Sequence, residues 1–243
     1  SSTSRGLGDV YKRQVQTALI KRSGVDPASV GQIVGGCVSQ AGEQTANIAR
    51  TAWLGAGMPL NVAATTVDAQ CGSSQQAVTL AYGLVASGVV DSAIGCGVES
   101  MTRNPMGSSY RKGQLTATSK YKENYEYTSQ FQGAELLAKK WGISREECDE
   151  FGLRSQENAA RAWEEDRFST QVVQIQTPVL DEDGKPTGAT KTVSRDGGLR
   201  PTTLETLSQL SPVLEGGVHT AGASSQISDG SGAVLLMTAE SAE

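Results

Sequence analysis

The alternation of apolar and polar positions along the first hundred residues predicts an α/β protein. Runs of β-branched or small apolar residues predict buried strands at residues 32–38, 62–67 and 91–98. Apolar residues at helical spacing predict helices at residues 15–23, 45–54 and 77–85. Because strand, helix and strand follow one another in this order, we expect a parallel sheet with right-handed crossovers.

The pattern changes after about residue 103. Residues 103–128 are polar and contain Tyr110, Tyr121, Tyr125 and Tyr127 without clear periodicity, which indicates an excursion from the sheet. These tyrosines either anchor the loop by packing or line a ligand channel.

A helix is predicted next, because Ser144 and Glu147 have the spacing of a capping box. Its expected apolar face carries Cys148, Phe151, Ser155, Ala159 and Trp163. Asp183 and Gly184 then predict a hairpin turn between strands at 172–179 and 189–193. Residues 234–237 predict a last strand.

These changes of pattern divide the chain into four parts. Residues 1–14 mix Ser, Gly, Arg and Lys with no apolar face, so we interpret them as a non-native leader and exclude them from the fold. Residues 15–105 form the predicted core, residues 106–219 a loop subdomain, and residues 220–243 a return to the core.

Composition narrows the classes of function. A net charge of −5 argues against nucleic-acid binding, and no apolar run approaches the roughly 20 residues that cross a membrane. The start has no secretory signal pattern, so we expect a cytoplasmic protein. Four cysteines without a CxxC motif and one distant histidine predict neither a disulfide framework nor a metal site.

One cysteine lies where a nucleophile is expected. Cys71 falls between the strand at 62–67 and the following helix, and Gly72 beside it permits a sharp turn. The N–H groups and the positive end of the dipole at a helix N-terminus favour the thiolate, which is the nucleophilic form of cysteine. The sequence therefore predicts covalent catalysis through Cys71.

The motifs around Cys71 occur in the order in which thiolases, the acyl-CoA C-acyltransferases, carry them, and from residue 15 onward the chain resembles this family. The matching segments are GGCVSQAGEQTANIAR (35–50), DAQCGSSQQ (68–76), GCGVESMTRNPM (95–106), the helix at 142–162, residues 200–210 and TAGASSQISDG (220–230). The resemblance implies an α/β, layered fold with a mixed, mainly parallel sheet, helices on both faces and a loop subdomain over the CoA site.

The resemblance also implies a reaction. Cys71 would be acylated during thiolytic cleavage of a 3-ketoacyl-CoA, or in the reverse Claisen condensation, with CoA as a substrate and no permanently bound cofactor. Ser225 matches a serine near the pantetheine arm and Arg200 an arginine near the nucleotide, although Ala223 replaces the usual Asn. Ser129 and Gln130 stand where short-chain members carry His-Met, as in bacterial thiolases for bulkier chains, including those of steroid degradation. The parent would be a homodimer or tetramer.

Part of the family's chemistry is expected outside this chain. The NEAF, GHP and CGGG-like motifs, which supply the base, the acid and further oxyanion donors, do not occur here. We therefore expect a fragment truncated at both ends, without the C-terminal thiolase domain and with little turnover. Alternatives are a non-catalytic thiolase-like protein that binds acyl-CoA or sterol, a ketoacyl synthase and an incomplete gene product.

Other reactive side chains have simpler interpretations. Cys37, Cys96 and Cys148 lie in apolar patterns and are expected in the core. His219 is expected to be a loop histidine, with general base as the competing interpretation. Glu99 follows an apolar strand and is expected to hold a loop by hydrogen bonds.

Overall fold

The computed structural model describes residues 7–110, 117–183 and 185–243, and the chain divides into two compact units. Unit 1 takes in the chain up to residue 114 together with residues 227–243, and unit 2 takes in residues 115–226. Unit 2 is therefore inserted between two parts of unit 1. The predicted boundaries at residues 105 and 219 lie close to these divisions and stay predictions.

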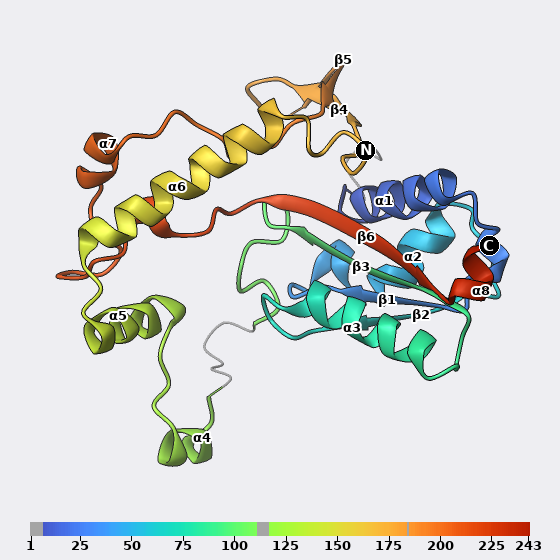
Figure 1. Ribbon diagram of the computed structural model, residues 1–243, viewed down its shortest axis with the longest axis horizontal. Helices are drawn as coiled ribbons and strands as arrows, with labels where there is room; N and C mark the ends of the chain where they lie inside the picture. Colours follow the sequence, from blue (N-terminus) through green and yellow to red (C-terminus); the bar gives the residue numbers. More distant parts are fainter. Residues whose placement is uncertain (1–6, 111–116, 184) are drawn as a thin grey trace. The chain divides into compact units, whose positions relative to one another are not determined.

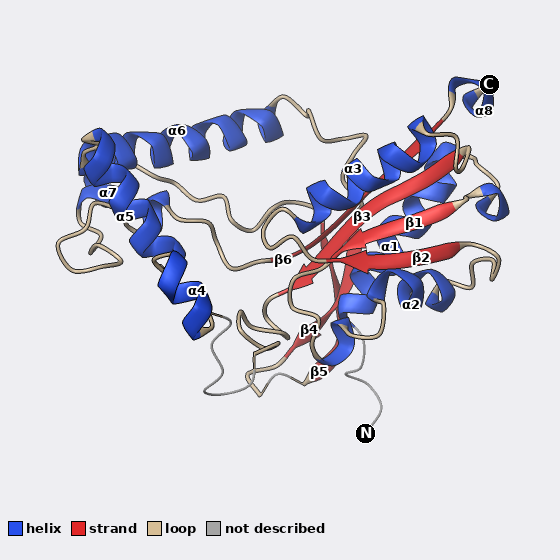
Figure 2. Ribbon diagram, turned by 90° about the horizontal axis from the view of Figure 1, so that it is seen from below, coloured by secondary structure: helices blue, strands red, loops and turns tan. Residues whose placement is uncertain are grey.

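Unit 1 is built around a four-stranded sheet with the strand order β2-β1-β3-β6 (Figures 1 and 2). Strands β1, β2 and β3 run parallel, and β6 is antiparallel to β3. Its elements, in chain order, are α1 (Leu7–Ser23), η1 (Pro27–Ser29), β1 (Gln32–Gly36), η2 (Gly42–Gln44), α2 (Ile48–Gly55), β2 (Ala63–Val67), α3 (Ser73–Ala86), β3 (Ser92–Ser100), β6 (Asp229–Met237) and α8 (Ala239–Ala242). The expected mixed, mainly parallel sheet is confirmed.

The two faces of the sheet have separate apolar layers, because neighbouring residues of a strand point to opposite sides. Ile33 and Ile94 pack with Trp53 of α2 on one face. Val34 packs with Ala77 of α3 on the other. Helices α1 and α2 thus cover one face and α3 the other, as Figure 2 shows and as the sequence predicted.

Two predicted helices have different bounds in the structure. Helix α1 begins at Leu7 instead of residue 15, because Lys, Arg and Gln are good helix formers even without an apolar face. Residues 7–14 of the predicted leader thus belong to α1, and residues 1–6 lie outside the described residues. The helix predicted at 45–54 is α2 preceded by η2, since Ala46 and Asn47 between them have positive φ.

Unit 2 is mostly helical and contains one two-stranded sheet, β4-β5. Its elements are α4 (Ser119–Asn124), α5 (Gln130–Trp141), α6 (Arg145–Glu164), β4 (Ile175–Leu180), β5 (Pro186–Val193), α7 (Leu204–Ser208) and η3 (Ala221–Ala223). The predicted hairpin is confirmed by the antiparallel pairing of Ile175 with Val193, although Gly184 of its turn lies outside the described residues. Helix α4 lies within the segment predicted to lack periodicity.

Helix α6 begins as predicted but buries a different face. Ser144 accepts from the amide of Glu147, whose carboxylate accepts from the amide of Ser144, so the capping box is confirmed. Cys148, Asp149 and Gly152 are buried, whereas Phe151 is 61% exposed. The prediction that Phe151 belongs to the packed face is therefore wrong within this unit, because the helix packs through Gly152 against the backbone of Gly222.

Candidate functional site

Cys71 lies in a tight turn between β2 and α3. Gln70 before it has a φ of +54°, a left-handed conformation that few non-glycine residues adopt. The turn is fixed by Ser73, whose Oγ accepts from the amide of Ala69 at 2.9 Å and donates to the carbonyl of Gln70 at 2.6 Å. The Asp68 carboxylate accepts from the amide of Gln70 at 2.7 Å. The backbone on both sides of the thiol is therefore held in place.

The hydrogen bonding of the two amides that follow Cys71 differs from the prediction. Unpaired N–H groups were expected beside the thiol, but Gly72 N donates to the carbonyl of Ala69 at 3.1 Å and Ser73 N to that of Gln70 at 2.9 Å. These bonds close the turn, since the left-handed Gln70 brings both carbonyls toward the start of the helix. The two amides stabilise the geometry of the turn.

Glycines in the sheet bring the start of α3 close to the strands. A Cβ at Gly36 of β1 would collide with the backbone of Ser73 and Ser74, and a Cβ at Gly97 of β3 would collide with Ser74 Oγ. The missing side chains leave room for the first turn of α3 over the carboxyl ends of these strands. Parallel α/β sheets bind ligands at that edge.

Cys71 differs from the other cysteines in exposure. It is exposed, whereas Cys37, Cys96 and Cys148 are buried, which confirms the prediction that these three belong to the core. Burial, together with the nearby Glu99 carboxylate, raises the pKa of Cys37 to about 11. Burial also raises the pKa of Cys96 and of Cys148. An external reagent or substrate therefore meets Cys71 first.

A buried polar network holds the loop that follows β1. The Glu99 carboxylate accepts from the amides of Val38 and Ser39 at 3.0 and 3.3 Å, as its predicted role requires. Gln44, fully buried, donates to Glu99 at 2.9 Å and accepts from the amide of Ser100 at 2.8 Å. Sequence reasoning missed Gln44, whose only signal was its place in the GEQ motif.

The two predicted CoA-binding residues lie in unit 2, on segments that hydrogen bonds join. Arg200 and Ser225 are both exposed. The amide of Arg200 donates to Gln156 of α6 at 3.2 Å, and Gln226, next to Ser225, donates to the carbonyl of Gly198 at 3.0 Å. The structure therefore brings the chain segments around Arg200 and Ser225 together.

His219 is oriented by a carboxylate of α5. Its Nδ1 lies 2.9 Å from Oε1 of Glu135, and both side chains are about one-fifth exposed. Burial raises the pKa of Glu135, but hydrogen bonds from the amides of His219 and Val218 and from the His219 ring lower it more, so the net pKa falls below its usual value. Sequence reasoning missed Glu135, because 84 residues separate the partners.

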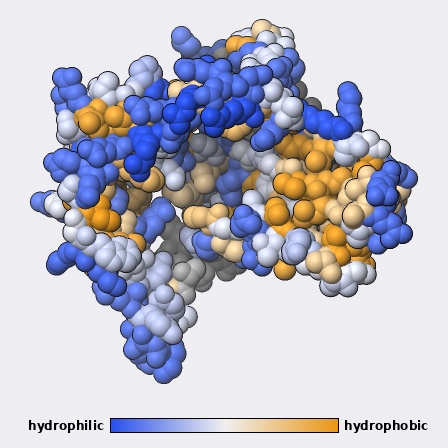
Figure 3. Space-filling model, in the orientation of Figure 1, coloured by the Kyte–Doolittle hydropathy of each residue, from blue (hydrophilic) through white to orange (hydrophobic). Residues whose placement is uncertain are grey.

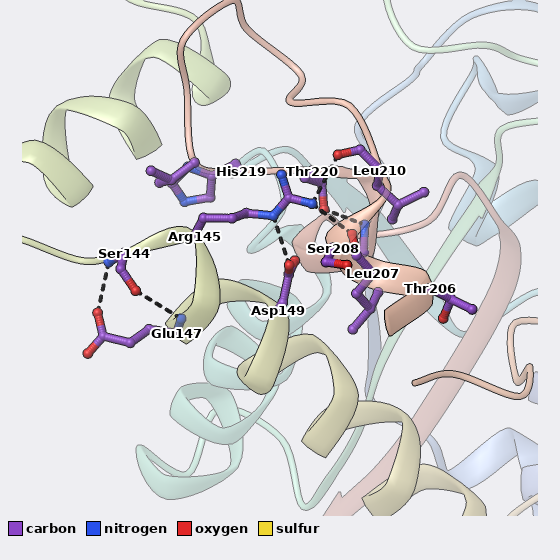
Figure 4. A network of polar contacts seen from close by, with 12 residues as sticks. Ser144, Arg145, Glu147, Asp149, Thr206, Leu207, Ser208, Leu210, His219 and Thr220 are labelled. Atoms are coloured by element: carbon purple, nitrogen blue, oxygen red, sulfur yellow. Dashed lines mark hydrogen bonds and ion pairs between the residues drawn. The ribbon is translucent and has the colours of Figure 1, made fainter. Parts of the chain in front are cut away.

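A second polar cluster lies beside His219 (Figure 4). Arg145 of α6 forms an ion pair with Asp149 at 2.8 Å and donates to the carbonyls of Leu207 and Leu210 at 2.7 and 2.9 Å. Asp149 is 4% exposed. This cluster ties the start of α6 to the end of α7.

The described residues offer an exposed thiol in a fixed turn. Among them no group of three or more His, Cys, Asp or Glu side chains is placed to hold a metal ion. In the same ranges, every helix is too short or too polar to span a bilayer. An exposed thiol in a fixed turn is suited to acyl transfer through a thioester.

Comparison with known proteins agrees with the resemblance noted in the sequence. Residues 9–240 match the family model described as thiolase, N-terminal domain. The chain is 39% identical to a steroid 3-ketoacyl-CoA thiolase of Mycobacterium tuberculosis, over 90% of this chain and 53% of that protein. It is 39% identical to a 3-ketoacyl-CoA thiolase of Bacillus subtilis, over 92% of this chain and 58% of that protein.

A plant relative gives a similar result. The chain is 41% identical to the peroxisomal 3-ketoacyl-CoA thiolase 1 of Arabidopsis thaliana, over 94% of this chain and 52% of that protein. The chain thus spans about half the length of the curated relatives it matches. Since the family model covers nearly all of it, the chain belongs to the thiolase family.

Proposed function

We propose that this chain is the N-terminal half of a 3-ketoacyl-CoA thiolase in which Cys71 is the acylated nucleophile. The observation that carries the proposal is that Cys71 is exposed in a fixed turn at the start of α3, whereas the other three cysteines are buried. Relatives about 40% identical bear the name 3-ketoacyl-CoA thiolase, which supports this substrate class.

The proposed reaction has two half-reactions. The Cys71 thiolate attacks the 3-keto carbon, and the bond between C2 and C3 then breaks with its electron pair going to C2. Protonation of C2 releases acetyl-CoA and leaves the shortened acyl group as a thioester on Cys71. The thiolate of a second CoA attacks this thioester and releases acyl-CoA with Cys71 free again. Run in reverse, the same steps form a carbon–carbon bond.

The proton transfers need groups beyond those described around Cys71. The only histidine of this sequence, His219, is hydrogen-bonded to Glu135 in unit 2. We assign the general base and the general acid to the half of the parent enzyme that this chain does not span. On this proposal the chain alone presents the nucleophile and has little turnover.

CoA is proposed as a substrate held by unit 2, with no cofactor bound permanently. Ser225 would contact the pantetheine arm and Arg200 the nucleotide, and the hydrogen bonds that join their segments support a common binding surface. We further propose that the parent is a cytoplasmic homodimer or tetramer. In the described part of the chain β2 is an outer strand of the sheet, with an edge open to pairing.

The proposal is tested by brief exposure of the purified chain to iodoacetamide at neutral pH, with mass-spectrometric mapping of each cysteine. We expect labelling of Cys71 well before the buried cysteines, and slower labelling when CoA is present. Cys71→Ser is the control that should leave the three buried thiols unlabelled over the same time. Equal labelling of all four cysteines, or labelling that CoA does not slow, would contradict the proposed site.

A further inference from the structure

The segment that leads into the proposed CoA-contacting Ser225 is a small hairpin. Val213 N donates to the carbonyl of His219 at 2.9 Å, and Pro212 and Thr220 form an antiparallel bridge. Gly217 N donates to the carbonyl of Leu214 at 2.9 Å and closes the tip. The hairpin spans nine residues and has few backbone bonds of its own, so its conformation depends on outside contacts.

Glu135 of α5 supplies contacts at this tip. Its carboxylate accepts from the amide of Val218 at 3.0 Å, from the amide of His219 at 3.0 Å and from the His219 ring at 2.9 Å. Hydrogen bonds to a charged acceptor are roughly twice as strong as bonds between neutral groups. One side chain therefore holds the amides of two successive residues and the ring of the second, His219.

Gly217 provides the space that this carboxylate occupies. A Cβ at Gly217 would collide with Oε1 and Cδ of Glu135. The residue does not need the left-handed conformation of Gly216 beside it, whose φ is +71°. The requirement for glycine at 217 is thus one of space, and an alanine there would displace Glu135, with the Leu214 carbonyl oxygen 3.0 Å from the new Cβ as a second close contact.

The end of the hairpin is fixed by a different set of contacts. Thr220 is fully buried, and its Oγ1 accepts from the amide of Gly222 at 3.1 Å. Gly222 packs against Gly152 of α6 and against Leu207 of α7. The guanidinium of Arg145 donates to the carbonyl of Leu207. Figure 4 shows His219 and Thr220 beside this arginine. Contacts with α6 and α7 therefore hold residues 220–224 in place, and Glu135 holds Val218 and His219, which precede them.

We propose that Glu135 is a positioning residue, which with His219 latches the Gly217–His219 tip to α5 and thereby sets the direction of the segment that presents Ser225 to CoA. The latch itself is a property of unit 2, and its consequence for CoA rests on the proposed function. Glu135 acts through the backbone of the segment, and no contact between Glu135 and CoA is part of the proposal.

Hydrogen exchange and CoA affinity, measured on the same samples, test the latch. Glu135→Gln removes the charge of the acceptor and converts one of its two oxygens to an NH2 group, so the bonds from the amides of Val218 and His219 should weaken, and we expect these amides to exchange about tenfold faster or more. The Kd for CoA should rise by the factor by which the latched fraction of the segment falls, so a large rise is expected only where the tip amides lose nearly all their protection. Amides of α6 should keep their protection, which shows that the unit remains folded.

Gly217→Ala is a second route to the same result, since its Cβ would displace the carboxylate without changing any charge. His219→Leu should have a smaller effect, because the two backbone bonds to Glu135 remain. Glu157→Gln makes the same chemical change at an exposed position of α6 and should alter neither exchange at the tip nor the Kd.

The possible outcomes test the latch, the positioning role and the CoA site separately. Unchanged exchange at Val218 and His219 in both Glu135→Gln and Gly217→Ala would overturn the latch. A variant whose tip amides exchange at nearly the unprotected rate, and which is therefore mostly unlatched, but whose Kd for CoA is unchanged would overturn the positioning role and leave the proposed function standing. A wild-type chain that does not bind CoA would overturn the proposed CoA site and with it the positioning role, while exchange would still decide the latch.

Discussion

At the scale of single residues, Lys12 places an amine in a buried position without a hydrogen-bond partner among the described residues. Its side chain is fully buried against the sheet. Burial lowers the pKa of Lys12 below its ordinary 10.5, and the nearby Cys96 and Cys37 oppose this only in part.

Replacing Lys12 with methionine should therefore stabilise unit 1. Because burial lowers the folded-state pKa, the cost of the buried charge is full below that pKa and disappears as the pH rises through it to 10.5, the value in the unfolded state. We expect Lys12→Met to raise the free energy of unfolding at pH 7 by about 1–3 kcal/mol. The gain should shrink toward pH 10.5 in urea denaturation curves.

The matched control for this change is Lys21→Met, at an exposed position of the same helix. It should change the free energy of unfolding by no more than about 0.5 kcal/mol. A loss of stability in Lys12→Met would show that the lysine amine has a stabilising role at this position.

At the scale of elements, the packing of α3 on the sheet depends on what each glycine faces. Gly36→Ala would press a methyl group against the backbone of Ser73 and Ser74, which has no rotamer to change. Gly97→Ala meets two side-chain atoms of Ser74, the Oγ, which can rotate away, and the Cβ, from which the methyl group can separate only by a small shift of α3. We expect a loss of about 2–3 kcal/mol for Gly36→Ala and of about 1 kcal/mol for Gly97→Ala, measured by denaturant unfolding.

Ser74→Ala provides a check on the second value, because it removes the Oγ that the new methyl group meets and leaves the Cβ, which would lie 2.7 Å from that methyl group. The double variant with Gly97→Ala should therefore recover part of the lost stability. Gly83→Ala, in α3 with open space around its Cα, should stabilise the chain by up to about 1 kcal/mol. Equal losses at Gly36 and Gly97 would contradict the assigned contacts.

Elements with a local sequence signal were predicted well, and those set by distant contacts were not. The capping box at Ser144 and Glu147 marks the start of α6 within one turn of chain. In contrast, the break before α2 depends on Asn47, whose Nδ2 donates to the carbonyl of Ala64 and whose Oδ1 accepts from Thr66. Periodicity carries no information about partners on another strand.

The candidate site likewise has one part that the sequence predicts and one part that it does not. The turn around Cys71 lies between a strand and a helix that both have local sequence patterns, so the sequence predicts its place, whereas the bonds made by the amides of Gly72 and Ser73 were not predicted. The latch between Glu135 and His219 joins residues 84 positions apart, and nothing in either local pattern points to the other. The acidic residue was therefore missed, and the histidine was predicted to be a loop residue without its partner.

At the scale of the whole molecule, unit 1 has large apolar side chains exposed on and beside α3. Leu80, Tyr82 and Val89, on and just after α3, are 41%, 63% and 66% exposed, and Figure 3 shows apolar side chains gathered over this region. A helix that is apolar on nearly every side is typical of one covered on both faces. Contiguous exposed apolar surface of this kind promotes association in water.

We therefore expect the purified chain to associate as its concentration rises, through the exposed face of α3. Leu80→Glu places a charge among the exposed apolar side chains of α3 and should shift the chain toward monomer in light scattering coupled to size-exclusion chromatography. Gln75→Glu adds the same charge to an exposed polar position of the same helix and should leave the association unchanged. Equal shifts in both variants would show that net charge, and not the exposed face of α3, controls association. A shift in neither variant would show that the chains associate through another surface, and the outer strand β2 is the next surface to test.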